Sequence, residues 1–130
     1  MSPNEVKDMA VLVLRKLQVE RKTGAVTPQN PITGQVIIDA YNKRFDTDFR
    51  TQDLSVAVAH AREVMRVPIG SSTKGYYFCT SEAEYDEFYE REMARIRNQR
   101  AAILGPKMKF RTQAQLELLE KNFDKMEMVI

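Results

Sequence analysis

The stretch VPIGSSTKGYYFC, residues 67–79, decides the fold. A proline disfavours helical geometry in the residue before it, so Pro68 requires any preceding helix to end near Arg66. Residues 67–69 and 76–79 are predicted as short strands, because the second is rich in aromatic residues and a polar, glycine-bounded segment separates the two. The stretch therefore predicts a small β-hairpin.

Two helices are predicted directly before this hairpin. The pattern GQVIIDAYNKRF, which starts at residue 34, predicts a helix that buries Val36, Ile37, Ala40, Tyr41 and Phe45. After a turn at residues 46–49, a helix capped near Thr51 is predicted to bury Leu54, Val58, Ala61 and Met65.

The order of these elements is that of a winged helix-turn-helix. Two helices joined by about four residues must cross at a steep angle, and a hairpin that follows them occupies the place of the wing. We therefore expect this fold over Pro31 to Thr80, with residues 31–33 as a short edge strand, the helix-turn-helix at 34–66 and the wing at 67–79.

Helices are predicted on both sides of this section. Ser2 to Glu5 form a capping box with proline at the first helical position, which predicts a helix over residues 3–22. Its buried stripe includes Met9, Val13 and Leu17, whereas Leu12 and Val19 lie off that stripe and are expected to touch a second element.

A second capping box at Ser81 begins a long helix, predicted over residues 82–104 and stopped by Gly105-Pro106. Residues 1–104 then form one domain, and residues 105–130 are a basic linker followed by a helix capped at Thr112. The expected fold class is mostly α with a small β-hairpin wing: a winged helix-turn-helix core plus a long C-terminal helical extension.

Composition limits the class of protein. A chain of 130 residues with 43% hydrophobic residues is expected to form one globular domain. It has no apolar run of membrane-spanning length, and its N-terminus does not resemble a secretory signal. A single cysteine, Cys79, fits a reducing compartment, so we expect a cytoplasmic protein without a membrane partner.

The stretches PITGQVIIDAYN and AREVMRVPIGSSTKGYYFCTSEAEYDEF resemble the winged-helix proteins of many phages and prophages. The resemblance covers residues 30–97 and rests on the pair Ala61-Arg62, the strand Pro68-Ile69 and a wing followed by Tyr76-Tyr77. The sequence departs from the pattern at residues 65–67, where a glycine is usual. The resemblance implies DNA binding, in transcription regulation or DNA replication, within the cytoplasm of a host cell.

Candidate DNA-binding residues follow from docking geometry. The second helix of the pair and the wing face the duplex in such folds, and Gln and Arg suit contacts with base edges, whereas hydroxyl groups and Lys suit phosphates. The candidates are Thr51, Gln52, Ser55, Ala59, Arg62 and Arg66 in the helix-turn-helix, Ser72 and Lys74 in the wing, and Arg91, Arg95 and Lys109 further along. A plain amphipathic surface helix would give the same pattern, and Arg62 could instead pair with a carboxylate.

Charge is segregated in the second half of the chain. Residues 81–90 carry five acids and no base, whereas residues 91–111 carry seven bases and one acid. The bases could neutralise backbone phosphates, while Arg97 and Arg100 could serve an acidic partner or the acidic stretch of a second subunit.

The last predicted helix carries a narrow apolar stripe, formed by Leu116, Leu119, Phe123 and Met126. The stripe is expected to form a homodimer or partner interface, and the alternative is that it packs back on the first helix. A homodimer would suit a palindromic DNA site. No catalytic motif, metal site or cofactor is predicted, since His60 and Cys79 stand without matching partners. The alternative function is a winged-helix interaction module that binds a host or phage replication or transcription protein without reading bases.

Overall fold

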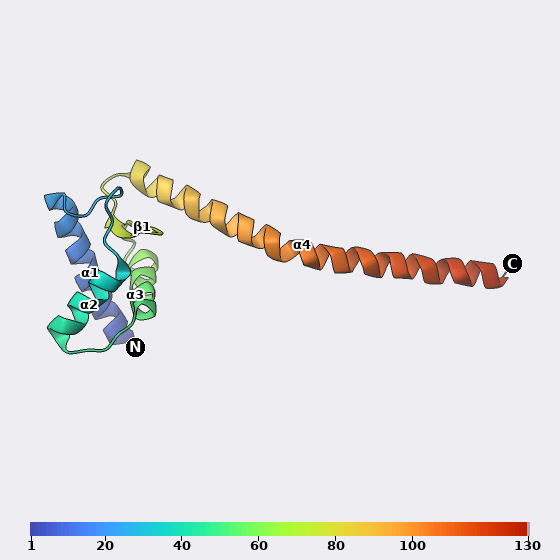
Figure 1. The fold of residues 1–130 in the computed structure, drawn as a ribbon, viewed down its shortest axis with the longest axis horizontal. Helices are drawn as coiled ribbons and strands as arrows, with labels where there is room; N and C mark the ends of the chain where they lie inside the picture. Colours follow the sequence, from blue (N-terminus) through green and yellow to red (C-terminus); the bar gives the residue numbers. More distant parts are fainter. Residues whose placement is uncertain (130) are drawn as a thin grey trace. The chain divides into compact units, whose positions relative to one another are not determined.

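Figure 1 shows the computed structural model of the chain, which describes residues 1–129; for residues 116, 119 and 122–129 it describes the backbone alone. Four helices and a hairpin follow one another in the described part: α1 (Pro3–Thr23), α2 (Gly34–Phe45), α3 (Thr51–Glu63), β1 (Ile69–Ser72), β2 (Gly75–Phe78) and α4 (Glu82–Val129). The chain divides into two compact units, residues 1–89 and 90–130. The mostly helical class with a small antiparallel hairpin is confirmed.

Helix α1 begins and ends as its sequence predicts. The Ser2 hydroxyl accepts a hydrogen bond from the Glu5 amide, and the Glu5 carboxylate accepts one from the Ser2 amide. Hydrogen bonding of the Glu5 carboxylate by the Ser2 amide, and then by the Ser2 side chain, holds the pKa of Glu5 below its usual value. At the other end Gly24 takes a left-handed φ of 83°, which terminates the helix.

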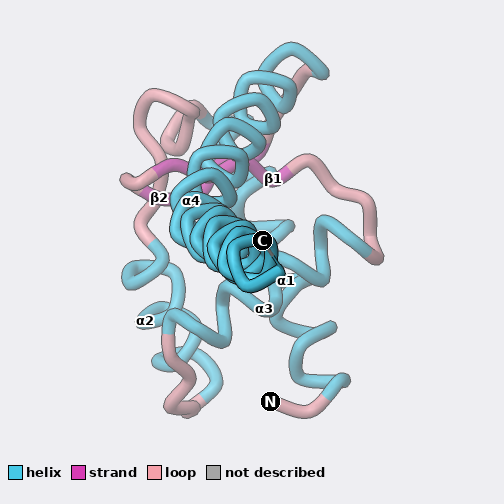
Figure 2. The backbone as a smooth tube through the Cα atoms, turned by 90° about the vertical axis from the view of Figure 1, so that its right-hand side faces the viewer, coloured by secondary structure: helices cyan, strands magenta, loops and turns pink. Residues whose placement is uncertain are grey.

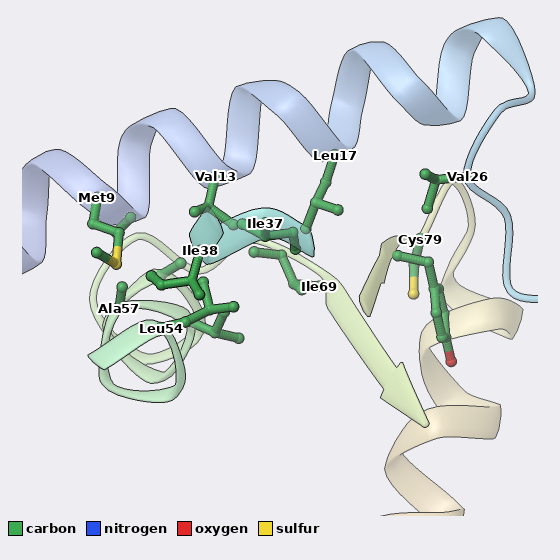
Figure 3. Close-up of a cluster of buried hydrophobic side chains, with 14 residues drawn as sticks. Met9, Val13, Leu17, Val26, Ile37, Ile38, Leu54, Ala57, Ile69 and Cys79 are labelled. Atoms are coloured by element: carbon green, nitrogen blue, oxygen red, sulfur yellow. The ribbon is translucent and has the colours of Figure 1, made fainter. Parts of the chain in front are cut away.

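The core of the first unit lies where α1, α2, α3 and the hairpin meet (Figure 3). α1 packs on α3 and on β2, and α2 packs on α3. The largest fully buried side chains are those of Met9, Leu17, Ile38, Leu54, Val58 and Ile69. The stripe predicted for α3 is confirmed at Leu54, Val58 and Ala61, which are buried.

The predicted hairpin is present, with its two strands drawn in magenta in Figure 2. The strands are Ile69–Ser72 and Gly75–Phe78 instead of the predicted residues 67–69 and 76–79, because residues 70–72 pair with β2 and the loop is shorter than expected. β1 and β2 are antiparallel, with Ile69 opposite Phe78 and Ser72 opposite Gly75, so residues 73–74 form the turn. The edge strand predicted at residues 31–33 is an isolated bridge, in which Ile32 and Tyr76 exchange two backbone hydrogen bonds of 3.0 and 2.8 Å. This bridge joins the wing to the segment before α2.

The face of α2 differs from the prediction. Ile37 and Ile38 are buried, whereas Val36 and Phe45 are 54% and 43% exposed, and Ala40 is also exposed. Tyr41 is half-buried, with its ring centre 4.7 Å from that of Phe45. A helix with apolar residues at three consecutive positions allows more than one buried face, and packing on α3 selects between them.

Helix α3 ends at Glu63, three residues before the predicted end. Arg66 takes a left-handed φ of 59°, and the Val67 amide donates a hydrogen bond back to the Ala61 carbonyl at 3.2 Å. Met65 is therefore half-buried beyond the helix, packed against the core without belonging to the helical stripe. The departure noted at residues 65–67 thus coincides with the end of α3.

The predicted helix stop at Gly105-Pro106 is wrong, since α4 continues through both residues. Proline lacks the amide that would bond the Ala102 carbonyl, but Ala102 is exposed, so its carbonyl can bond to solvent instead. Residues 107–111 are helical instead of a linker. The Thr112 hydroxyl does not cap a new helix; it donates to the Met108 carbonyl at 3.0 Å. The boundary between units also falls after residue 89, not after residue 104.

Candidate nucleic-acid interface

A hydroxyl-lined groove of about 320 Å³ runs between the N-terminal ends of α2 and α3 and the β1–β2 turn. We call it the hydroxyl groove. It brings together four predicted DNA-binding residues: Thr51 and Ser55 from α3 and Ser72 and Lys74 from the wing. Its remaining lining residues are Thr33, Gly34, Gln35, Ser71, Thr73, Gly75 and Tyr76.

Local hydrogen bonds fix the hydroxyl groups of this groove. Thr33 caps α2, its hydroxyl accepting from the Val36 amide at 3.3 Å. The Ser55 hydroxyl donates to the Thr51 carbonyl at 3.2 Å, and the Ser72 hydroxyl accepts from the Lys74 amide at 3.2 Å. The Lys74 side chain is exposed at the tip of the turn. Short hydroxyl groups beside a reaching cation are the chemistry that contacts phosphate oxygens.

Glycine is required where the wing meets the segment before α2. Gly75 has a φ of +143°, and a Cβ there would lie 2.1 Å from the Ile32 carbonyl oxygen. At Gly34 an added Cβ would come within 3.3 Å of Leu54 and 3.4 Å of Tyr76. The Gly75 and Ile32 backbones therefore approach closely, and Gly34 packs against the side chains of Leu54 and Tyr76 at one wall of the hydroxyl groove.

Arg62 connects α3 to the hairpin. Its Nε donates to the Ile69 carbonyl at 2.8 Å, and its Nη2 donates to the Ser71 hydroxyl at 3.2 Å. Its guanidinium lies 4.6 Å from the centre of the Phe88 ring, a cation–π contact. Arg62 therefore has a structural role in the fold, through a backbone carbonyl, a hydroxyl and an aromatic ring.

The other candidates on the first unit are exposed. Gln52 and Ala59 lie on the outer face of α3, and Arg66 follows its end. Arg50, which the sequence reasoning missed, is exposed at the start of α3. Its amide donates to the Asp53 carboxylate at 2.8 Å, so that acid is engaged in capping the helix. A cation therefore stands at each end of α3.

Arg91, Arg95 and Lys109 belong to the second unit, where all three are exposed along α4. Arg95 forms a salt bridge of 2.7 Å with Glu92, one turn earlier, which raises the pKa of Arg95. Such an exposed pair contributes little to stability, so Arg95 remains able to exchange its partner. The side chains of the predicted interface residues Leu116, Leu119, Phe123 and Met126 lie outside those that the structure describes.

Another groove, of about 470 Å³, lies between α1 and α2. We call it the α1–α2 groove. Val19 and Phe45 line it with 61% and 43% of their surfaces exposed, and Leu12, Tyr41 and Arg44 complete its wall. Leu12 and Val19 are the residues that lie off the buried stripe of α1, which was the sequence signal for this surface.

The described residues contain no cluster of His, Cys, Asp or Glu that could hold a metal ion. No helix among them is long and apolar enough to cross a membrane. Comparison of the chain with family models, with curated proteins and with solved structures gave no match.

Proposed function

We propose that this protein binds double-stranded DNA as a winged helix-turn-helix, with α3 as the recognition helix and the β1–β2 turn as the wing. The observation that carries the proposal is the hydroxyl groove, which joins the start of α3 to the tip of the wing. In a winged helix these are the two elements that approach the duplex.

The exposed side chains of α3 suit this role. Gln52 can make paired hydrogen bonds with adenine, and the small side chains of Ser55 and Ala59 allow the helix to approach base edges closely. Lys74, Arg50 and Arg66 supply cations for phosphates on either side of the helix. The resemblance of residues 30–97 to phage winged-helix proteins supports a role in transcription regulation or DNA replication.

Electrostatics sets the expected strength of binding. Three phosphate contacts in the first unit correspond to a slope of about −2.7 for the logarithm of the binding constant against the logarithm of salt concentration. That slope is shallow for a DNA-binding protein, so affinity must also come from hydrogen bonds made by α3 and the wing.

Fluorescence anisotropy with a labelled random duplex tests the proposal. We expect binding at low salt that weakens as salt rises, and selection from a random pool should enrich sites that α3 reads. Absence of duplex binding at low salt would refute the proposal.

A second candidate function is a protein-interaction module, favoured by the exposed apolar lining of the α1–α2 groove. In this role the protein would bind a replication or transcription protein of a host or phage without reading bases. Affinity capture after nuclease treatment tests it, with Phe45→Asp as the variant. A partner that the native chain and Phe45→Asp capture equally well would argue against use of this groove.

A further inference from the structure

Helix α4 exposes a line of apolar side chains at heptad spacing. Tyr89, Ile96, Ile103 and Phe110 follow one another every seven residues, and they are 49%, 47%, 77% and 71% exposed. Residues seven apart lie on one face of a helix, with a drift of about 20° per heptad that left-handed supercoiling removes. We call these four residues the α4 seam.

The seam begins where α4 stops packing on the core of the first unit. Tyr85 packs against that core and Phe88 is buried, whereas Tyr89, one residue later, is half exposed. The seam has one apolar residue per heptad, a narrower line than the two of a full coiled-coil repeat, and a second helix with a matching line can bury it. The seam therefore indicates a helical partner for α4.

The distribution of charge along α4 favours a second copy of the same helix, aligned antiparallel. Before the seam's midpoint, between Gln99 and Arg100, residues 82–92 carry six acids and one base. After it, residues 107–117, which an antiparallel copy sets beside residues 82–92, carry three bases and one acid. A second copy aligned parallel would place like charges side by side, whereas an antiparallel copy places each acidic stretch beside a basic one.

The antiparallel register also pairs the seam with itself. With the two helices centred on that midpoint, Ile96 of one copy lies beside Ile103 of the other, and Tyr89 beside Phe110. The same register sets Glu90 level with Lys109 and Glu92 level with Lys107. Apolar pairing and charge pairing therefore agree on a single alignment.

We propose that α4 forms an antiparallel coiled coil with a second copy of this chain through the α4 seam. The paired segments, residues 82–117, are about 54 Å long. Isolated helices are marginal in water below about 12–15 residues, and these segments are much longer than that. The interface is centred on residues 89–110, distinct from the stripe of residues 116–126 expected from the sequence. It does not depend on DNA binding.

Sedimentation analysis of the full chain tests the association. We expect twice the chain mass of 15.0 kDa for the native protein and a single chain mass for the double variant Ile96→Asp/Ile103→Asp. Met108→Asp is the matched control, because Met108 is 47% exposed like Ile96 but lies on the opposite face of α4. A monomeric native chain, or a loss of dimer in Met108→Asp equal to that in the double variant, would overturn the proposal.

Disulfide trapping tests the direction. Ile96→Cys and Ile103→Cys chains, mixed and oxidised, should cross-link to each other, whereas Ile103→Cys alone should not, because its thiols lie about 10 Å apart along the paired helices. The native Cys79 is only 2% exposed and does not compete. Efficient cross-linking of Ile103→Cys alone would establish a parallel pair and overturn the antiparallel assignment.

Discussion

Gly75 has a backbone conformation and a neighbour that both exclude side chains. Its φ of +143° is rarely adopted by L residues, and a Cβ would collide with the Ile32 carbonyl oxygen at 2.1 Å. We expect Gly75→Ala to lower the free energy of unfolding by about 2–3 kcal/mol, since strain and displacement of a backbone bridge add. Urea unfolding measures this change.

The matched control is Gly24→Ala. Gly24 also has a positive φ, of +83°, but nothing lies within 4 Å of an added Cβ. We expect a loss of about 1 kcal/mol from the left-handed conformation alone. Equal losses in the two variants would show that the contact with Ile32 does not constrain the wing.

Lys74 tests the DNA proposal at a single residue. Its side chain is exposed at the tip of the wing, so its removal costs no packing. We expect Lys74→Gln to weaken binding to all duplex sequences alike and to reduce the magnitude of the salt slope by about one, as the loss of one phosphate contact requires. Anisotropy titrations at several salt concentrations measure both. A salt slope unchanged from that of the native protein would remove Lys74 from the interface.

Arg62 shows what a sequence pattern leaves open. Its position on α3 was predicted, but a charge at a helix surface is equally suited to a phosphate and to a carbonyl. The structure has it donating to Ile69 and Ser71 beside the ring of Phe88. We expect Arg62→Met to destabilise the fold by about 2 kcal/mol, because it leaves the Ile69 carbonyl unpaired and removes the cation–π contact.

The control for Arg62 is Arg66→Met, since Arg66 is exposed beyond the end of α3. Thermal unfolding should leave Arg66→Met close to the native protein. If Arg62→Met unfolded at the same temperature as Arg66→Met, the hydrogen bonds of Arg62 would not contribute to the stability of the fold.

Among the elements, the ones predicted best are those with local signals. The caps of α1 and α4 and the glycine of the wing turn act within a few residues, so the sequence alone located them, whereas Pro68 placed the end of α3 and the start of β1 only to within about three residues. The buried face of α2 depends on contacts with α3, which lies outside its own sequence. Of the residues that line the hydroxyl groove, the sequence predicted Thr51, Ser55, Ser72 and Lys74 as DNA-binding. It did not predict Thr33 or Tyr76, because the Ile32–Tyr76 bridge brings these two residues together and is a long-range contact.

Pro106 offers a test of the continuity of α4. Within a helix it costs about 3 kcal/mol relative to alanine, because it removes one hydrogen bond and crowds the preceding turn. We expect Pro106→Ala to raise helix content and thermal stability as measured by circular dichroism at 222 nm. A chain in which α4 stopped at residue 104 would show no gain.

At the scale of the whole molecule, the two units should respond differently to protein concentration. The first has its own core, whereas apolar side chains of the second are exposed along the α4 seam. If the seam pairs two copies, mass action makes the helical signal at 222 nm melt at a higher temperature as concentration rises.

Four of the five tyrosines lie within residues 1–85, and the fifth, Tyr89, belongs to the α4 seam. In a Tyr89→Phe variant, which keeps an aromatic ring in the seam, tyrosine fluorescence therefore reports the first unit separately. We expect its transition to depend less on concentration than the helical signal does. A helical transition independent of concentration would contradict pairing through the seam.

Because Cys79 is buried, the rate of its chemical modification reports how often the first unit opens. The thiol is the only one in the chain, and burial raises its pKa, so it stays neutral and shielded while the first unit is folded. The Cys79 thiol loses its proton at a lower pH in the unfolded state than in the folded state. Raising the pH above about 8.5 therefore favours the unfolded state and lowers the free energy of unfolding. Below that pH, the rate at which an alkylating reagent modifies Cys79 measures how often the hairpin separates from α1, without any engineered label.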